Sequence, residues 1–226
     1  MKIVNVVLLF VAVSFSVNCV AQKNKKAKPF EGHIFYSVTP QGEVDASLTA
    51  QLPTQVKIYF KGDKTREEKI TPMGSVVTLN DITTKVQVVL IDMMGQKMAL
   101  KATKEEIEKV LAKIPQGTLV VGSETKKIAG LNCKKIDFTQ EGKTETIFIT
   151  EELDIPNSNW QTEYKDVPNV ILEFVQVIPT QDSEIKMLVS ATEVKKEKIK
   201  AEMFVVPTGY QEMSMSEFKK MMGGGE

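Results

Sequence analysis

The stretch VKIYFKGDK, residues 56–64, carries the pattern that decides the fold of this 226-residue chain. Its apolar side chains recur at every second position, at Val56, Ile58 and Phe60, with lysine and tyrosine between them. This alternation is typical of a strand that buries one face. The Gly-Asp pair at 62–63 that follows is the kind of two-residue turn that joins antiparallel strands. The stretch therefore predicts a β-hairpin.

The same alternation and turn chemistry recur along the chain. Residues 33–38 and 86–90 alternate in the same way, and a Glu-Gly turn at 141–142 separates the apolar runs 136–138 and 147–149. Consecutive strands joined by tight turns favour an antiparallel meander over a parallel sheet with crossover helices. Further strands are predicted at 117–128, 170–178, 184–194 and 201–206.

Two segments have helical spacing instead. Thr103 and Glu106 form a capping box at the start of a predicted helix over 104–114, which Pro115 ends. Ser214 is expected to cap a second, shorter helix over 214–222. The fold class is therefore mainly β (α+β), a curved antiparallel sheet or half-barrel packed against one or two short helices. No repeat or linker divides residues 30–222, which form a single β-rich domain, and 223–226 are a flexible glycine-rich tail.

The first 21 residues have the parts of a secretory signal peptide. Lys2 precedes an apolar run over 3–17 that is too short to cross a bilayer, and small residues lead to a cleavage site after Ala21. The product is exported, and is expected in the periplasm or associated with the outer membrane. The alternative is a lipoprotein anchored through Cys19, and only then is the membrane a partner. Residues 22–29 form a basic spacer.

Charge and cysteine content exclude several classes of protein. The chain has 29 basic and 29 acidic residues, so no strong field attracts nucleic acid, and we predict no nucleic-acid partner. Removing the leader leaves one cysteine, Cys133, so no internal disulfide is possible. Cys133 is expected to be a buried apolar residue.

No residue pattern in the chain predicts catalysis. His33, the single histidine, reads as an outward-facing strand residue, and zinc, phosphate-loop, dinucleotide and nucleophile-elbow motifs are absent from the sequence. We therefore predict no enzyme, catalytic residue, metal or cofactor. A copper(I) site is the less favoured reading of the C-terminal methionines, because Phe218 interrupts their row.

Residues 151–169 form a long excursion between predicted strands, hereafter the excursion. It contains the single tryptophan, Trp160, and Tyr164 follows closely. Long connections in compact domains tend to be functional. These two aromatic residues are candidates for a recognition site; the alternative is that Trp160 only covers the end of the sheet.

Five spaced segments resemble a known family. The chain is similar, over its mature length, to the exported bacterial proteins grouped as domain of unknown function 4412, which look like relatives of the LolA-like lipoprotein-carrier fold. The resemblance implies a sheet that curls around helices and leaves an apolar cavity for acyl chains. It carries over no site residue. The matching segments are FEG at 30–32, IYFKGDK at 58–64, KIAG at 127–130, CKK at 133–135 and PTGY at 207–210.

The leading functional hypothesis is an exported, non-enzymatic envelope protein that binds a lipid or acylated partner, such as a lipoprotein, in an apolar cavity. The two helices should supply one wall of this pocket. The alternative is a structural or protein-interaction module whose core is packed and whose strand edges or excursion bind another protein. The predicted wall residues are Ile107, Val110, Leu111, Phe218 and Met221.

Overall fold

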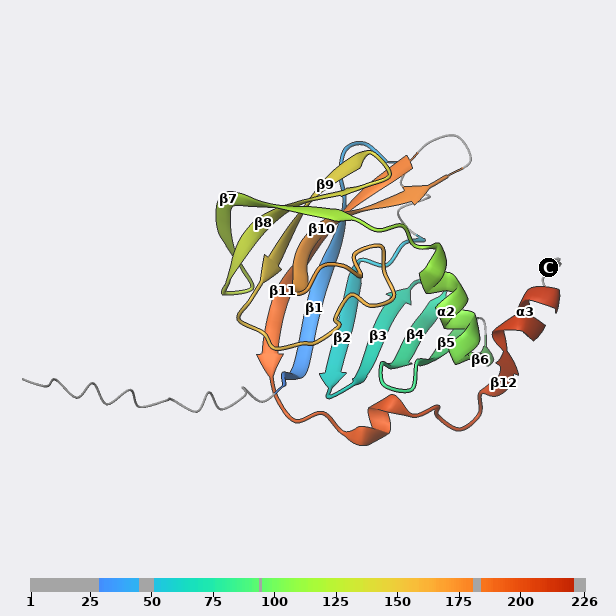
Figure 1. The fold of residues 1–226 in the computed structure, drawn as a ribbon. Coiled ribbons are helices and arrows are strands. Elements are labelled where there is room, and N and C mark those ends of the chain that lie inside the picture. The colour runs from blue at the N-terminus through green and yellow to red at the C-terminus, as the bar shows by residue number, and fades with distance from the viewer. Residues whose placement is uncertain (1–28, 45–50, 94, 181–183, 222–226) are drawn as a thin grey trace, which may run out of the picture.

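A computed structural model describes residues 29–44, 51–93, 95–180 and 184–221. The predicted leader, the spacer up to residue 28 and the tail lie outside the described residues. Within them, twelve strands form one sheet in the order β12-β6-β5-β4-β3-β2-β1-β11-β10-β9-β8-β7 (Figure 1). The strands are β1 (Glu31–Pro40), β2 (Gln55–Lys61), β3 (Lys64–Thr71), β4 (Gly74–Asp81), β5 (Val86–Met93), β6 (Gln96–Ala102), β7 (Thr118–Ile128), β8 (Leu131–Gln140), β9 (Lys143–Thr150), β10 (Val170–Pro179), β11 (Glu184–Lys196) and β12 (Gln211–Ser214).

The sheet consists of two meanders joined in the middle. β2 to β6 follow one another through hairpins, as do β7 to β9, and β1 pairs with both β2 and β11. All neighbouring pairs are antiparallel except β12 with β6, so the sheet is mixed. The predicted turns are confirmed: Glu141 and Gly142 both have positive φ, 50° and 78°, as a tight antiparallel hairpin requires. The prediction of a mainly β fold is correct.

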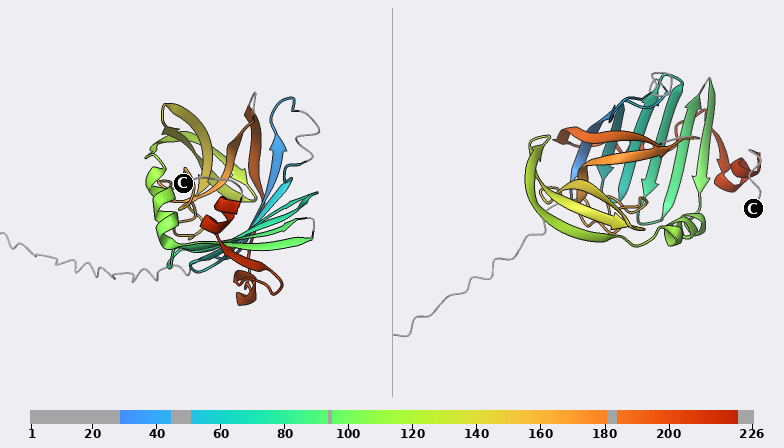
Figure 2. Two further views of the ribbon diagram at one scale, coloured as in Figure 1. Left: turned by 90° about the vertical axis from the view of Figure 1, so that its right-hand side faces the viewer. Right: turned by 90° about the horizontal axis from the view of Figure 1, so that it is seen from above.

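Two short α-helices accompany the sheet. α2 (Lys104–Lys113) begins with the predicted capping box, in which Thr103 accepts from the Glu106 backbone and Glu106 accepts from the Thr103 backbone. α3 (Met215–Met221) begins with the equivalent exchange between Ser214 and Glu217. The two helices stand beside each other at the β6 end of the sheet (Figure 2).

The strand predicted at 201–206 is wrong. Its first residues form a 3₁₀ turn, η1 (Ala201–Phe204), and no strand pairs with this segment among the described residues. The segment instead crosses the face of the sheet opposite α2, where Val206 and Tyr210 pack against a buried cluster of β4, β5 and β6 (Figure 1). Two features explain why this segment is not a strand. Its apolar side chains are covered by contact with this face, and Pro207 has no N–H to donate to a neighbouring strand. The cluster comprises Val77, Leu79, Leu90 and Ala99.

We call the face that packs against the excursion and α2 the inner face, and its opposite the outer face. The largest cluster of buried apolar residues lies at the junction of β1, β2, β10 and β11, where Ile34 and Leu172 are fully buried. A second cluster connects β8 and β9 to the excursion through Tyr164 and Val167. The core therefore crosses from one meander into the other.

His33 differs from its prediction. It points to the outer face, yet only 4% of it is exposed. The Phe35 ring stacks on it with centroids 4.1 Å apart, while Glu197 lies 2.8 Å from Nδ1 and Glu193 lies 3.0 Å from Nε2. Each ring nitrogen thus has a carboxylate partner supplied by β11 or the segment after it. The histidine fixes β1 to the C-terminal part of the chain.

We predict that Cys133 reacts slowly with thiol reagents in the native protein. Its side chain is fully buried, and burial raises the pKa of the thiol, which lowers the fraction of reactive thiolate at neutral pH. Labelling with an aromatic disulfide reagent should be slow in buffer and complete in denaturant. Fast labelling in buffer would show that the thiol is accessible.

Candidate functional site

The first candidate site is a crevice of about 390 Å³ between α2, α3 and the inner face, which we call the helical crevice. The side chain of Ile107 packs down toward the sheet and is buried, so it anchors α2, while Ala102 leaves room on the floor beneath the helix. Gln87 and Gln161 close one end. The lining residues are Gln87, Ala102, Glu106, Ile107, Lys109, Val110, Leu111, Lys113, Gln161, Met215 and Lys219.

The structure brings three of the five predicted wall residues into this crevice. Ile107, Val110 and Leu111 line it from α2, with Val110 57% exposed. Phe218 and Met221 do not line it, and Met221 is 63% exposed. The contribution of α3 comes instead from Met215, about one turn before Phe218, and from Lys219, the residue after Phe218. The apolar spacing of α3 did not reveal which of its turns would border the crevice.

The rim of the helical crevice is basic. Lys109, Lys113 and Lys219 line it, and none of them forms an ion pair among the described residues. The only lining carboxylate is Glu106, which already accepts the Thr103 backbone N–H at 2.8 Å. Lysine stems cover apolar surface while their ammonium groups stay hydrated. The crevice thus combines apolar walls with an excess of positive charge, three lysines against one carboxylate.

The second candidate site is a crevice of about 340 Å³ between the excursion and the inner face, which we call the loop crevice. Val56, Ile58 and Phe60 of β2 form an apolar part of its floor. The polar part includes Glu67 and Lys69, whose charges compensate each other at 2.5 Å. The other lining residues are Tyr36, Thr65, Thr78, Asn80, Gln87, 158–164, Val170, Ile171, Phe174, Gln176 and Val189.

The two aromatic candidates of the excursion have different environments. Trp160 is half-buried and lines the loop crevice. Only 3% of Tyr164 is exposed; its ring packs edge-on against Phe138 and Phe174, and its hydroxyl donates to Glu145 at 2.7 Å. Burial, with Glu145 beside it, raises the pKa of Tyr164. Tyr164 therefore holds the excursion in place, and Trp160 is the residue of the pair placed to meet a ligand.

A buried amide shapes the excursion. The Asn159 side chain donates to the carbonyls of Val167 and Asn169, at 3.0 and 2.9 Å, and so joins the middle of the excursion to its end. The backbone carbonyl of Asn159 accepts from both the backbone N–H and the hydroxyl of Thr162. Because these bonds are internal, the roof of the loop crevice has a defined conformation without regular secondary structure.

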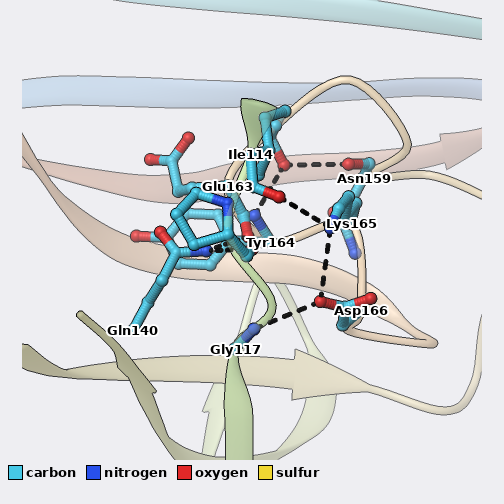
Figure 3. A network of polar contacts seen from close by, with 10 residues as sticks. Ile114, Gly117, Gln140, Asn159, Glu163, Tyr164, Lys165 and Asp166 are labelled. Atoms are coloured by element: carbon cyan, nitrogen blue, oxygen red, sulfur yellow. Dashed lines mark hydrogen bonds and ion pairs between the residues drawn. The ribbon is translucent and has the colours of Figure 1, made fainter. Parts of the chain in front are cut away.

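The excursion is also tied to the end of α2 (Figure 3). Lys165 donates to the carbonyl of Ile114 at 3.2 Å, and the Gly117 N–H donates to Asp166 at 3.2 Å. Gln140 of β8 donates to the Pro115 carbonyl at 2.8 Å. A lysine at the carbonyl end of a helix is also favoured by the helix dipole. The walls of both crevices therefore belong to one connected unit.

The described residues contain no group of three or more His, Cys, Asp or Glu side chains arranged to hold a metal ion. None of the helices in the described ranges has the length and apolar character needed to cross a membrane.

No protein-family model and no curated protein matches the sequence, so the resemblance to domain of unknown function 4412 stays a prediction. Two solved structures of PNGF-II, in space groups P21 and C2, are similar in fold, with TM-scores of 0.53 and 0.52 and 20% identity. In both, the match covers 86% of this chain and 33% of the PNGF-II chain. The chain therefore spans about a third of the length of PNGF-II, and the likeness shows the fold alone.

We predict that Asn159→Ala destabilises the protein by about 1–3 kcal/mol, because the buried carbonyl of Val167 and the half-buried carbonyl of Asn169 lose their donor. Urea unfolding followed by circular dichroism measures the change. The matched control is Glu163→Gln in the same excursion, whose exposed side chain can lose its charge with little effect. Equal unfolding midpoints for both variants would mean that the Asn159 bonds do not hold the roof.

Proposed function

We propose that this protein is an exported, non-enzymatic envelope protein that holds the acyl chain of a lipid or acylated partner in the helical crevice. The observation that carries the proposal is the combination found there: a volume of about 390 Å³, apolar side chains from two helices, and three lysines without ion-pair partners among the described residues. Ligand sites start at about 300 Å³ and are mainly apolar with a few polar groups that orient the ligand.

The lysines favour a ligand that carries negative charge at one end. A carboxylate or phosphate at the rim would meet Lys109, Lys113 and Lys219, while the attached chain would cover Ile107, Val110 and Leu111. Burial of each methylene contributes ~0.8 kcal/mol, so each added carbon should tighten binding about fourfold until the crevice is full.

The curved half-barrel expected from the sequence is part of the same proposal. β7 lies against β11 although three strands separate them in the sheet, and Figure 2 shows β7, β8 and β9 turned over the remaining strands. Such curvature creates an inner face that helices, the excursion or a ligand must cover, because an apolar face left to water is unfavourable.

A second candidate is a module that binds another protein by strand addition. β7 is an edge strand, and Val120 and Val121, which point to opposite faces, are 62% and 67% exposed. An uncovered apolar edge strand is a template for an added strand. This function becomes the better account if the helical crevice binds no acyl chain.

We predict that octanoate, decanoate and dodecanoate bind with increasing affinity and that Val110→Glu abolishes this binding. Val110 is exposed, so the substitution leaves the core intact but places a charged carboxylate where the apolar chain of the ligand would lie. Isothermal titration calorimetry measures both effects. The matched control is Ala112→Glu, which adds the same charge to the same helix outside the crevice lining and should bind normally. Absence of binding by the wild-type protein would refute the proposal.

A further inference from the structure

One row of directly paired residues crosses the floor of both crevices. Phe60 pairs with Thr65, Thr65 with Asn80, Asn80 with Gln87, and Gln87 with Ala102. The first four line the loop crevice, and the last two line the helical crevice. Four steps between neighbouring strands span ~19 Å. This exceeds the ~15 Å that one leaflet contributes to the hydrocarbon core of a bilayer, so the row can hold a long acyl chain along its whole length.

A single contact divides the row. Gln87 rises from β5 and Gln161 descends from the excursion, and Gln87 Nε2 donates to Gln161 Oε1 at 2.6 Å. Both residues line both crevices. The two volumes are therefore neighbouring parts of one space, separated by one side-chain hydrogen bond.

This partition can open without moving the excursion. Gln161 has no other side-chain hydrogen bond among the described residues, whereas its neighbours Asn159 and Thr162 are held by several. Rotation of the Gln161 side chain leaves Gln87 bonded to Asn80 at 2.9 Å. Opening thus breaks one hydrogen bond and lets the Gln161 amide turn to solvent.

The floor beyond the partition suits an apolar chain. The polar side chains of the row bond to one another, because Asn80 Nδ2 also donates to Thr65 Oγ1 at 3.1 Å. A chain that lies over them leaves these bonds intact, which lowers the cost of covering polar groups. The row then ends on β2, where Val56, Ile58 and Phe60 offer apolar surface.

We propose that the ligand is a single-chain amphiphile with a long tail that occupies both crevices. Its negative group lies at the lysines of the helical crevice, its chain passes between Gln87 and Gln161, and its methyl end reaches the loop crevice beside Trp160. This inference rests on the proposed function of the helical crevice, and it adds the class of chain that the site selects. A chain that ends within the helical crevice, for which decanoate serves as the probe, stops before the partition, and a longer one such as hexadecanoate passes it.

The single tryptophan reports where the tail ends. Bromine on a fatty acid quenches tryptophan fluorescence only at close range. Hexadecanoate brominated at its methyl end should strongly quench Trp160, and hexadecanoate brominated next to its carboxylate should not, although both bind. Tight binding of both acids with no quenching from the methyl end, or with the reverse pattern, would overturn the inference.

Two variants locate the tail independently. Thr78→Phe fills the loop crevice and should weaken hexadecanoate binding at least about tenfold without changing decanoate binding, whereas Thr125→Phe, on exposed β7, should change neither. Gln161→Ala removes the partition without touching the core. It should bind hexadecanoate roughly two- to tenfold more tightly, a gain larger than any change in decanoate binding, because only the longer chain has to pass Gln161.

The outcomes separate the two proposals. If the wild-type protein binds decanoate but gains nothing from six further carbons, and Thr78→Phe and Gln161→Ala have no effect, the helical crevice is the whole site and the inference fails alone. If neither acid binds, the proposed function fails and the inference fails with it. Circular dichroism and melting temperature of each variant establish that it is folded.

Discussion

The pairing of β1 with β11 is the constraint on which the rest of the structure depends. β1 pairs along its length with β11, which begins more than 150 residues later in the sequence. This pairing joins the two local meanders into one sheet. It requires close backbone approach at Gly32, where a Cβ atom would lie 2.1 Å from the Lys195 carbonyl oxygen. Behind the ladder, Tyr36 reaches across and donates to the carbonyl of Ile171 at 3.0 Å. A buried carbonyl that lacks a hydrogen-bond donor destabilises the fold. The Tyr36 bond therefore fixes the position of β10 against β1, in addition to the apolar packing there.

Once this register is fixed, the geometry of both crevices follows from it. Hairpin pairing carries the register from β1 through β2 to β6, and so places one residue of each strand in the row that forms the crevice floor. A shift of one residue in any of these ladders would turn the row to the outer face. The roof is set separately, by Asn159 within the excursion and by the contacts of Lys165 and Asp166 with the end of α2. Floor and roof are thus built by different kinds of interaction, strand pairing below and hydrogen bonds between side chains and backbone groups above.

The features that could be predicted from the sequence are the local ones. Alternation at 56–60 and the Glu-Gly turn at 141–142 identify hairpins, and Thr103 with Glu106 identifies the start of α2, because each of these signals lies within a few residues. The same helical spacing placed Ile107, Val110 and Leu111 on one face of α2.

Long-range features had no such signal. The environment of His33 depends on Glu193 and Glu197, which lie more than 150 residues away. The apolar run at 203–206 has strand-like composition, yet it packs on the outer face because Tyr210 and Val206 cover the cluster there. The contact between Gln87 and Gln161 could not be predicted either. One glutamine lies in a strand and the other in a loop, and they meet only when the excursion folds over the sheet.

The covering of the outer face by 197–210 has a consequence for the order of events during synthesis. Val77, Leu79 and Leu90 emerge from the ribosome more than 100 residues before Val206 and Tyr210, the residues that shield them. Until then the β2–β6 meander has an apolar outer face open to water and an unpaired β6 edge, which are the features that make partly folded chains associate. The same delay affects β1, whose partner β11 is also made late. The two meanders can each pair locally, but the junction between them and the cover of the outer face cannot form until nearly all of the chain has been made.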